Sequence, residues 1–296
     1  MYAKLSEQEK LDYMFKQVLS IKEFLAIIMK NCMEEYKDED LDTIIREYIE
    51  NHIQVGEKKV HNIISGVNTE INQDKKKTTF DINFYARLPK NKDRISIVIN
   101  VEAQSDFNPG YHMMNRAHYY NARNISTQFG IFFDEYQYDN LRKVVSIWLL
   151  LEPPKYKNDG INRYVMTEEH LYGNIKEDKE LIQKNEIIMV YLSRKSKSKF
   201  IQLFNDLRDH KFDMNEFYET LKIDYGYNKT IERESEVTQM CDYGQYVKNK
   251  GEFEATLKHI RNIMKNFNVN ELAALQSLEI EEKDYPLYLE ALKSLN

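Results

Sequence analysis

The 296-residue sequence predicts a mixed α/β fold, in which a β-sheet is flanked by helices and followed by a helical C-terminal region. Three observations predict it. Apolar residues recur at helical spacing near the N-terminus, two segments between residues 78 and 104 alternate apolar with polar residues, and the chain after residue 193 has helical patterns only. A hydrophobic content of 42%, with nine glycines and five prolines, is typical of a globular chain and excludes a largely disordered one.

The N-terminal part predicts helices. From Leu11 to about Glu34 apolar residues return every three or four positions, which indicates one or two helices with a new start near Ser20. Another helix is expected from Leu41 to Ile49. It follows an acidic stretch whose charges are typical of a solvated turn.

The next two segments predict an antiparallel hairpin. Residues 78–88 and 95–104 both alternate, and a polar connection at 89–94 joins them. Because successive side chains of a strand point to opposite faces, one face of the hairpin is apolar and the other is polar. Asp81 lies on the polar face of the first strand, and Glu102 and Gln104 lie on that of the second.

The rest of the chain alternates between helix and strand before becoming helical. We expect a helix from His112 to Phe129 that crosses back over the sheet, and a central strand at Val144–Leu151 because VVSIWLLL is apolar on both faces. Glu186–Leu192 is a further strand candidate, with a short helix as the alternative. After the basic stretch SRKSKSK, helices are expected at 199–221 and from about 233 onward. The expected domains are therefore a core at 1–193 and a helical C-terminal region at 194–296.

Bulk properties limit the function classes. A net charge of −6 argues against coating nucleic acid by general attraction, but it permits a local acidic site with basic surroundings. The two cysteines, Cys32 and Cys241, have no spacing that would form a structural zinc site. The start of the chain does not resemble a secretory signal and no long apolar window follows, so we expect a cytoplasmic protein without a membrane partner.

The polar face of the hairpin is the candidate site for chemistry. Two acids on adjacent strands, Asp81 and Glu102, can bind one divalent cation, and the Ala103 carbonyl is a further candidate ligand. The Gln104 amide can orient a water or contact a phosphate. One or two Mg²⁺ ions supply the chemistry of phosphodiester hydrolysis. Spacing alone does not decide the matter, since an acidic strand face is more often simply solvated.

Three segments read in order, FDINFYA, ISIVINVEAQ and NRAHYYNARNISTQF, resemble the PD-(D/E)XK nuclease family transposases, a group related to the recombination-promoting nucleases of mobile elements. LDYMFKQVL and ERESEVTQMCDYGQ resemble the opening and the C-terminal entry of that family. The resemblance spans most of the chain and is specific at about residues 11–151. It implies a restriction-endonuclease-like mixed sheet and an Mg²⁺-dependent endodeoxyribonuclease, a hydrolase of DNA recombination, with Mn²⁺ as a substitute cation.

Carried onto matching positions, the resemblance makes Asp81, Glu102 and Gln104 catalytic and assigns metal binding to Asp81, Glu102 and Ala103. Asp12, in the opening stretch, is favoured over Glu23 as the candidate third acid. Gln104 departs from the wider superfamily, where Lys is commonest, and a neutral amide cannot stabilise an attacking hydroxide by charge. Two hypotheses therefore stay open: an active nuclease, or a silent nuclease-fold protein that binds nucleic acid or another protein.

The helix after the hairpin is the candidate DNA-binding element. Arg116, Tyr120 and Arg123 are spaced at i, i+4 and i+7, which places them on one helix face. They could meet DNA phosphates, or the tyrosine could pack on the sheet while the arginines pair with local acids. A homodimer is an expectation by analogy, because cutting both strands of a duplex calls for two sites.

Overall fold

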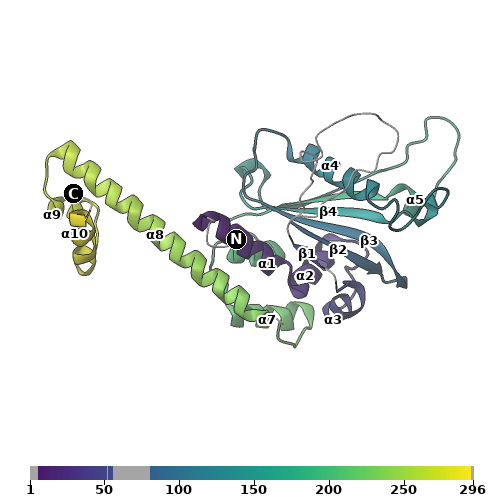
Figure 1. The fold of residues 1–296 in the computed structure, drawn as a ribbon, viewed down its shortest axis with the longest axis horizontal. Coiled ribbons are helices and arrows are strands. Elements are labelled where there is room, and N and C mark those ends of the chain that lie inside the picture. Colours follow the sequence, from purple (N-terminus) through teal and green to yellow (C-terminus); the bar gives the residue numbers. More distant parts are fainter. Residues whose placement is uncertain (1–5, 52, 56–80, 232, 295–296) are drawn as a thin grey trace. The chain divides into compact units, whose positions relative to one another are not determined.

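The computed structural model describes residues 6–51, 53–55, 81–231 and 233–294 (Figure 1). By contacts the chain divides into two compact units, Met1–Met240 and Cys241–Asn296, which are described separately below. The first unit is mixed α/β and holds the sheet, and the second is helical. The predicted mixed α/β class and the helical C-terminal region are thereby confirmed. The predicted domain boundary at residue 193 stays a prediction.

A six-stranded mixed sheet forms the centre of the first unit, in the order β1-β2-β3-β4-β6-β5. Its two inner pairs, β3 with β4 and β4 with β6, are parallel, and the other pairs are antiparallel. The strands are β1 Gln54–Val55, β2 Ile82–Leu88, β3 Asn91–Gln104, β4 Lys143–Leu150, β5 Gly160–Val165 and β6 Asn185–Tyr191.

The predicted hairpin is present as β2 and β3, with Ile82 opposite Val101. The expected start of the first strand, at 78–80, lies outside the described residues. The connection is shorter than predicted, because β3 begins at Asn91 and only two residues form the turn. Register shifts around Arg87 let the polar residues 91–94 join the strand.

Helices cover the two faces of this sheet (Figure 1). On one face α4, Met113–Ser126, crosses the strands as predicted and buries Met113, Ala117 and Tyr120 against β4 and β6. The other face carries α1, Glu7–Leu19, and α2, Lys22–Cys32, which are separated near Ser20 as the sequence indicates. The predicted helix at 41–49 is split into α3, Leu41–Thr43, and a π-helical turn, Ile44–Tyr48.

The strand predictions after the hairpin also hold, and the sequence interpretation missed two strands, one after the hairpin and one before it. β4 lies between β3 and β6 as expected for a segment apolar on both faces, and β6 is a strand, not a short helix. The sequence interpretation missed β5, whose side chains are mostly exposed because it pairs only with β6 among the described strands. It also missed the two-residue β1, which needs β2 as its partner.

The helices after β6 belong to both units. In the first unit Phe24 of α2 stacks on Phe217 with ring centroids 5.0 Å apart, and it meets Phe204 edge-on at 6.3 Å. These rings lie on α7, Met214–Tyr225, and α6, Lys199–Arg208. The remaining helices of the first unit are α5, Lys179–Ile182, and the 3₁₀ turns Tyr138–Asn140 and Lys155–Lys157.

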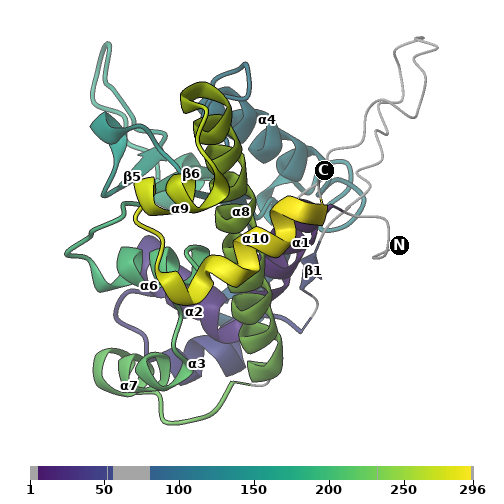
Figure 2. The same cartoon turned by 90° about the vertical axis from the view of Figure 1, so that its left-hand side faces the viewer.

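The second unit is a small helical cluster. It contains the later part of α8, Glu234–Phe267, with α9, Glu271–Ser277, a 3₁₀ turn, Glu282–Asp284, and α10, Tyr285–Ser294. Figure 2 shows α9 and α10 beside the end of α8. Its core is small and aliphatic, made by Leu257, Ile260, Ala274, Leu275 and Leu292. Within the described residues, no helix combines the length and the apolar character needed to cross a membrane.

Candidate functional site

Asp81 and Glu102 meet at one end of the hairpin, as their alternation predicts. Asp81 directly precedes β2 and lies across from Glu102 of β3. The Asp81 main-chain N–H donates to Glu102 Oε1 at 3.1 Å, and the Ala103 N–H donates to Asp81 Oδ2 at 3.0 Å. Each carboxylate is therefore held by the main chain of the opposite strand, which fixes both acids on the polar face of the sheet.

The Ala103 carbonyl is directed toward the same side as Asp81. In an extended strand the N–H and C=O of one residue point the same way, and the Ala103 N–H points at Asp81. The next carbonyl, that of Gln104, points the other way and accepts from the Leu151 N–H at 2.9 Å. The Ala103 side chain is buried in the apolar face. Two carboxylates and one carbonyl oxygen thus face one region, and oxygen ligands of this kind suit Mg²⁺.

Glu102 is buried and Asp81 is partly buried, and the close cation of the pair, Lys16, contacts Asp81 and not Glu102. Only 1% of Glu102 is exposed, and the nearest ion-pair contact of its carboxylate, Arg116 Nη2, is 3.8 Å away. Burial, and then the charge of Asp81, raise the pKa of Glu102 to about 8. Burial also raises the pKa of Asp81, although Lys16 opposes the shift. A divalent cation would relieve the repulsion between the Asp81 and Glu102 carboxylates. Their oxygen atoms therefore fit a cation in charge as well as in ligand type.

Lys16 belongs to the site, and the sequence interpretation did not single it out. Its Nζ lies 2.9 Å from Asp81 Oδ1 and 2.7 Å from Asp12 Oδ2. Asp12 and Lys16 are four residues apart on α1, so they share a helix face. The signal was present in LDYMFK, the opening stretch that contains both residues.

The candidate third acid, Asp12, reaches the carboxylate pair through Lys16. Within the described parts of the chain, no three His, Cys, Asp or Glu side chains gather as ligands of one metal ion. Glu23, the other N-terminal candidate, is elsewhere: it is buried and accepts from the Tyr227 hydroxyl at 3.1 Å. The oxygen atoms available to a cation at the site are therefore those of the Asp81 and Glu102 carboxylates and of the Ala103 carbonyl.

Gln104 and Arg116 form the second side of the site. Gln104 Oε1 accepts from Arg116 Nη1 at 3.1 Å, and Gln104 Nε2 donates to the Asp106 carbonyl at 2.9 Å. Arg116 Nη2 donates to the Tyr120 hydroxyl at 2.8 Å, and the guanidinium lies over the rings of Tyr120 and Trp148, 5.0 and 5.5 Å from their centroids. The guanidinium is thus held in place between the glutamine amide and two aromatic rings.

Two of the three predicted DNA-binding residues lie beside the carboxylates, and the third lies further along α4. Arg116 and Tyr120 share one face of α4 beside the carboxylates, and Tyr120 is also buried, 5.6 Å from the Trp148 ring. Arg123 is half-buried about 10 Å further along the helix axis than Arg116, by the rise of an α-helix over seven residues. The Tyr120 ring therefore packs on the sheet, as one of the two alternatives predicted, and the Tyr120 hydroxyl accepts a hydrogen bond from Arg116.

The polar face of the hairpin is not a solvated surface, because α4 covers it. Asn83 Nδ2 donates to Asn124 Oδ1 at 3.4 Å, and both residues are buried. Further along the sheet Ser146 Oγ accepts from Asn100 Nδ2 at 3.3 Å and from Trp148 Nε1 at 2.6 Å. The solvated-face interpretation of the acidic strand is therefore wrong for Glu102. Its carboxylate stands at the end of a buried polar layer.

The site is assembled from three separate segments. Lys16 and Asp12 come from α1, the two carboxylates from the β2–β3 hairpin, and Arg116 from α4. Each segment also belongs to the motifs on which the resemblance to the PD-(D/E)XK transposases was based. Comparison of the chain with family models, curated proteins and solved structures found no match.

Proposed function

We propose that the protein is a metal-dependent endodeoxyribonuclease that hydrolyses phosphodiester bonds at the Asp81–Glu102 pair. One observation carries the proposal: Glu102 is buried beside a second carboxylate, that of Asp81, and among the described residues no cation lies closer to the Glu102 carboxylate than Arg116 Nη2 at 3.8 Å, because Lys16 pairs with Asp81. A buried acid with a purely structural role, as the alternative for Glu102, would be expected to have a direct counter-ion. The cations suit a substrate that brings negative charge.

Asp81, Glu102 and the Ala103 carbonyl would hold Mg²⁺, or Mn²⁺ in its place. When bound, the ion supplies a reactive water at neutral pH and neutralises charge on the scissile phosphate. The hydrogen bonds from the Asp81 and Ala103 N–H groups keep both carboxylates in position for this role. Because these bonds come from the main chain, the arrangement does not depend on mobile side chains.

Lys16 is our candidate for the charge that Gln104 cannot supply. Its Nζ contacts Asp81, so it lies close enough to the carboxylate pair to donate a hydrogen bond to a water or hydroxide there. Gln104 has a different task, which is to hold Arg116 through its side-chain oxygen. Arg116 in turn is placed to contact a phosphate oxygen with its guanidinium.

DNA is the proposed substrate because of the resemblance to the transposase-related nucleases. The same resemblance underlies three further proposals: a role in the movement or recombination of mobile DNA, a homodimer that presents two sites to a duplex, and a cytoplasmic location. The net charge of −6 favours local recognition at the Lys16 and Arg116 positions over general attraction to DNA.

A second candidate function is a nuclease-fold protein that binds DNA without cutting it. Gln104 favours it, because the position where lysine is commonest in the superfamily is occupied by an amide already engaged with Arg116 and Asp106. The two candidates differ in turnover and not in binding. A cleavage assay therefore separates them.

The test is nicking of supercoiled plasmid by the purified protein with Mg²⁺ or Mn²⁺, alongside Asp81→Ala and Glu102→Ala. We expect metal-dependent nicking that falls to background in both variants. Glu34→Ala is the matched control, since Glu34 is an exposed acid paired with Lys37 away from the site. Equal nicking by all four proteins would indicate a contaminating nuclease. DNA binding without nicking in any of them would establish the second candidate.

A further inference from the structure

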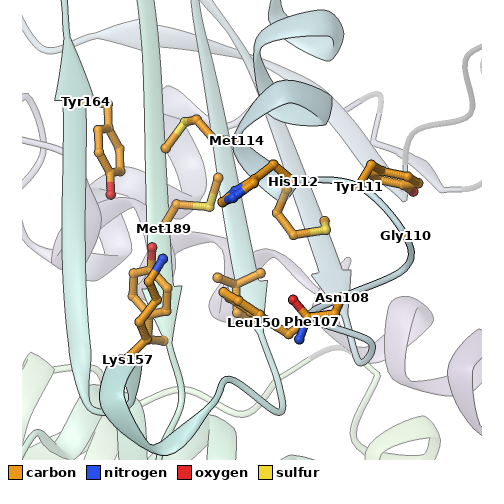
Figure 3. Close-up of a pocket in the computed structure, with 12 residues that line it drawn as sticks. Phe107, Asn108, Gly110, Tyr111, His112, Met114, Leu150, Lys157, Tyr164 and Met189 are labelled. Atoms are coloured by element: carbon orange, nitrogen blue, oxygen red, sulfur yellow. The ribbon is translucent and has the colours of Figure 1, made fainter.

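A separate hollow lies on the sheet face covered by α4. It has a volume of about 480 Å³ and is walled mainly by aromatic and methionine side chains (Figure 3). The loop between β3 and α4 forms one side and turns at Gly110, whose φ of +92° favours glycine. The opposite side is formed by the ends of β4 and β6 and by β5. The volume is within the range typical of small-ligand pockets.

This pocket begins at the strand next to β3 and extends to β6, two strands away from the carboxylate pair. Gln104, Leu150 and Tyr191 are aligned across β3, β4 and β6, and the last two line the pocket. Neighbouring strands are about 4.8 Å apart, so the pocket wall at Tyr191 is about 10 Å from Gln104 along the sheet. The gap is spanned by Arg116 and Tyr111: Arg116 Nη1 donates to the Tyr111 hydroxyl at 3.3 Å, and Tyr111 lines the pocket.

The lining suits a flat aromatic group that is attached to negative charge. Phe107 and Tyr164 present rings from opposite sides, and Met114 and Met189 add polarisable surface between them (Figure 3). Lys157 carries its ammonium 5.6 Å from the Phe107 ring centroid. Among the residues that line the hollow in the described structure, none is acidic. Asn108 and His112 supply polar groups for the edge of a base.

We propose that this pocket binds an unpaired nucleobase of the DNA strand whose backbone runs past Arg116 to the Asp81–Glu102 pair. Bases taken out of the helical stack are bound between aromatic or apolar side chains, and stacking of this kind tolerates any base. The DNA strand as the source of the base rests on the proposed function. It follows that the preferred substrate has an unpaired nucleotide close to the bond that is cut, as in single-stranded or distorted DNA.

The test measures base insertion without requiring cleavage. A short single-stranded oligonucleotide with one 2-aminopurine is titrated with the full-length protein in EDTA, and the fluorescence of the base reports stacking. We expect quenching by the wild-type protein, and an affinity at least about tenfold weaker for Phe107→Ala and for Tyr164→Ala. The matched control is Tyr172→Ala, because Tyr172 is a fully exposed tyrosine that does not line the pocket. Thermal melts establish that each variant is folded.

Three results would overturn the proposal: unchanged quenching and affinity in both pocket variants, equal binding of blunt duplex and single strand by the wild type, or displacement of the oligonucleotide by dAMP at equal affinity. The last result would identify a free nucleotide as the ligand. Failure of the proposed function is recognised separately. If the protein quenches 2-aminopurine but never nicks plasmid, the proposed function fails and the base-binding pocket stands. If it nicks plasmid but the pocket variants bind as the wild type does, only the base-binding proposal fails.

Discussion

Glu102 and Glu186 are two buried acids of the same sheet with opposite surroundings. Both are almost fully buried, but they lie on opposite faces, because Glu102 aligns with Trp148 whereas Glu186 aligns with Val145. Glu186 accepts two hydrogen bonds from Arg163, at 2.6 and 2.9 Å, and its carboxylate lies 2.7 Å from Lys143 Nζ. Glu102 accepts a hydrogen bond from the Asp81 main-chain N–H, and among the described residues the cation nearest to its carboxylate is Arg116 Nη2, at 3.8 Å.

The pKa shifts of the two acids go in opposite directions. For Glu186, burial alone would raise the pKa, but Arg163 and Lys143 outweigh it and lower the pKa below its ordinary value. For Glu102, burial and the charge of Asp81 dominate and raise the pKa to about 8. Burial of an acid therefore does not by itself indicate function. An acid that is buried without counter-ions is the better candidate for binding a cation.

The largest effect on stability is expected from Glu186→Ala. The substitution leaves the partly buried Arg163 without its carboxylate and the mostly buried Lys143 with Glu35 alone, and breaking such a buried pair costs about 3–5 kcal/mol. Urea unfolding measures the loss. Nicking by the fraction that remains folded should be unchanged. If the free energy of unfolding fell by less than about 1 kcal/mol, Glu186 would not have the structural role that distinguishes it here from Glu102.

Glu102 and Glu186 are expected to change the pH dependence of stability in opposite directions, and Glu102→Gln tests the first. Because the folded-state pKa of Glu102 is raised, its contribution to stability is complete below its ordinary value of 4.5 and is lost as the pH rises toward about 8. In EDTA the wild type should therefore lose a few kcal/mol relative to Glu102→Gln over this range, at about 1.4 kcal/mol per pKa unit.

Glu186→Gln is the comparison for that experiment. The pKa of Glu186 is lowered, so its stabilisation is present above the ordinary pKa and lost as the pH falls below it. Urea unfolding from about pH 2 to about pH 9 gives both profiles, because the loss for Glu186 lies below its ordinary pKa of 4.5. If the stability of the wild type and of Glu102→Gln varied with pH in the same way, the raised pKa of Glu102 would be contradicted.

A smaller effect is expected from Lys16→Met. Without the ammonium, Mn²⁺ no longer competes with a cation for Asp81, so its affinity should rise a few-fold, while nicking should slow by about 10- to 100-fold. Calorimetric titration with Mn²⁺ and the plasmid assay separate the two effects. Lys10→Met on the same helix is the control. Weaker Mn²⁺ binding together with full activity would contradict the proposed role.

The smallest effect is expected from Asp12→Asn. The Asp12 side chain is 46% exposed and its pair with Lys16 is of the i,i+4 kind, so stability should change by at most about 0.5 kcal/mol. Nicking should fall only two- to threefold, through a less restrained Lys16. If activity instead fell to the level of Asp81→Ala, Asp12 would have to bind the cation itself.

The residue pattern alone predicts which residues share a strand face and, to within a few residues, where the helices lie. A strand has a period of two, so Asp81 and Glu102 had to be on the polar face once the hairpin was recognised. The interruption of the apolar spacing near Ser20 likewise predicted the break between α1 and α2. These are local properties, decided by neighbours within a few residues.

The surroundings of these residues depend on how distant segments of the chain pack together. Lys16 reaches Asp81 because α1 packs near the end of the hairpin, although 64 residues lie between the two in sequence. The exposed side chains of β5 give no strand signal, and only pairing with β6 makes that segment a strand. Glu102 is buried because α4 crosses its face. Burial and counter-ions set the charge state of an acid, and both depend on contacts between segments that are distant in the chain.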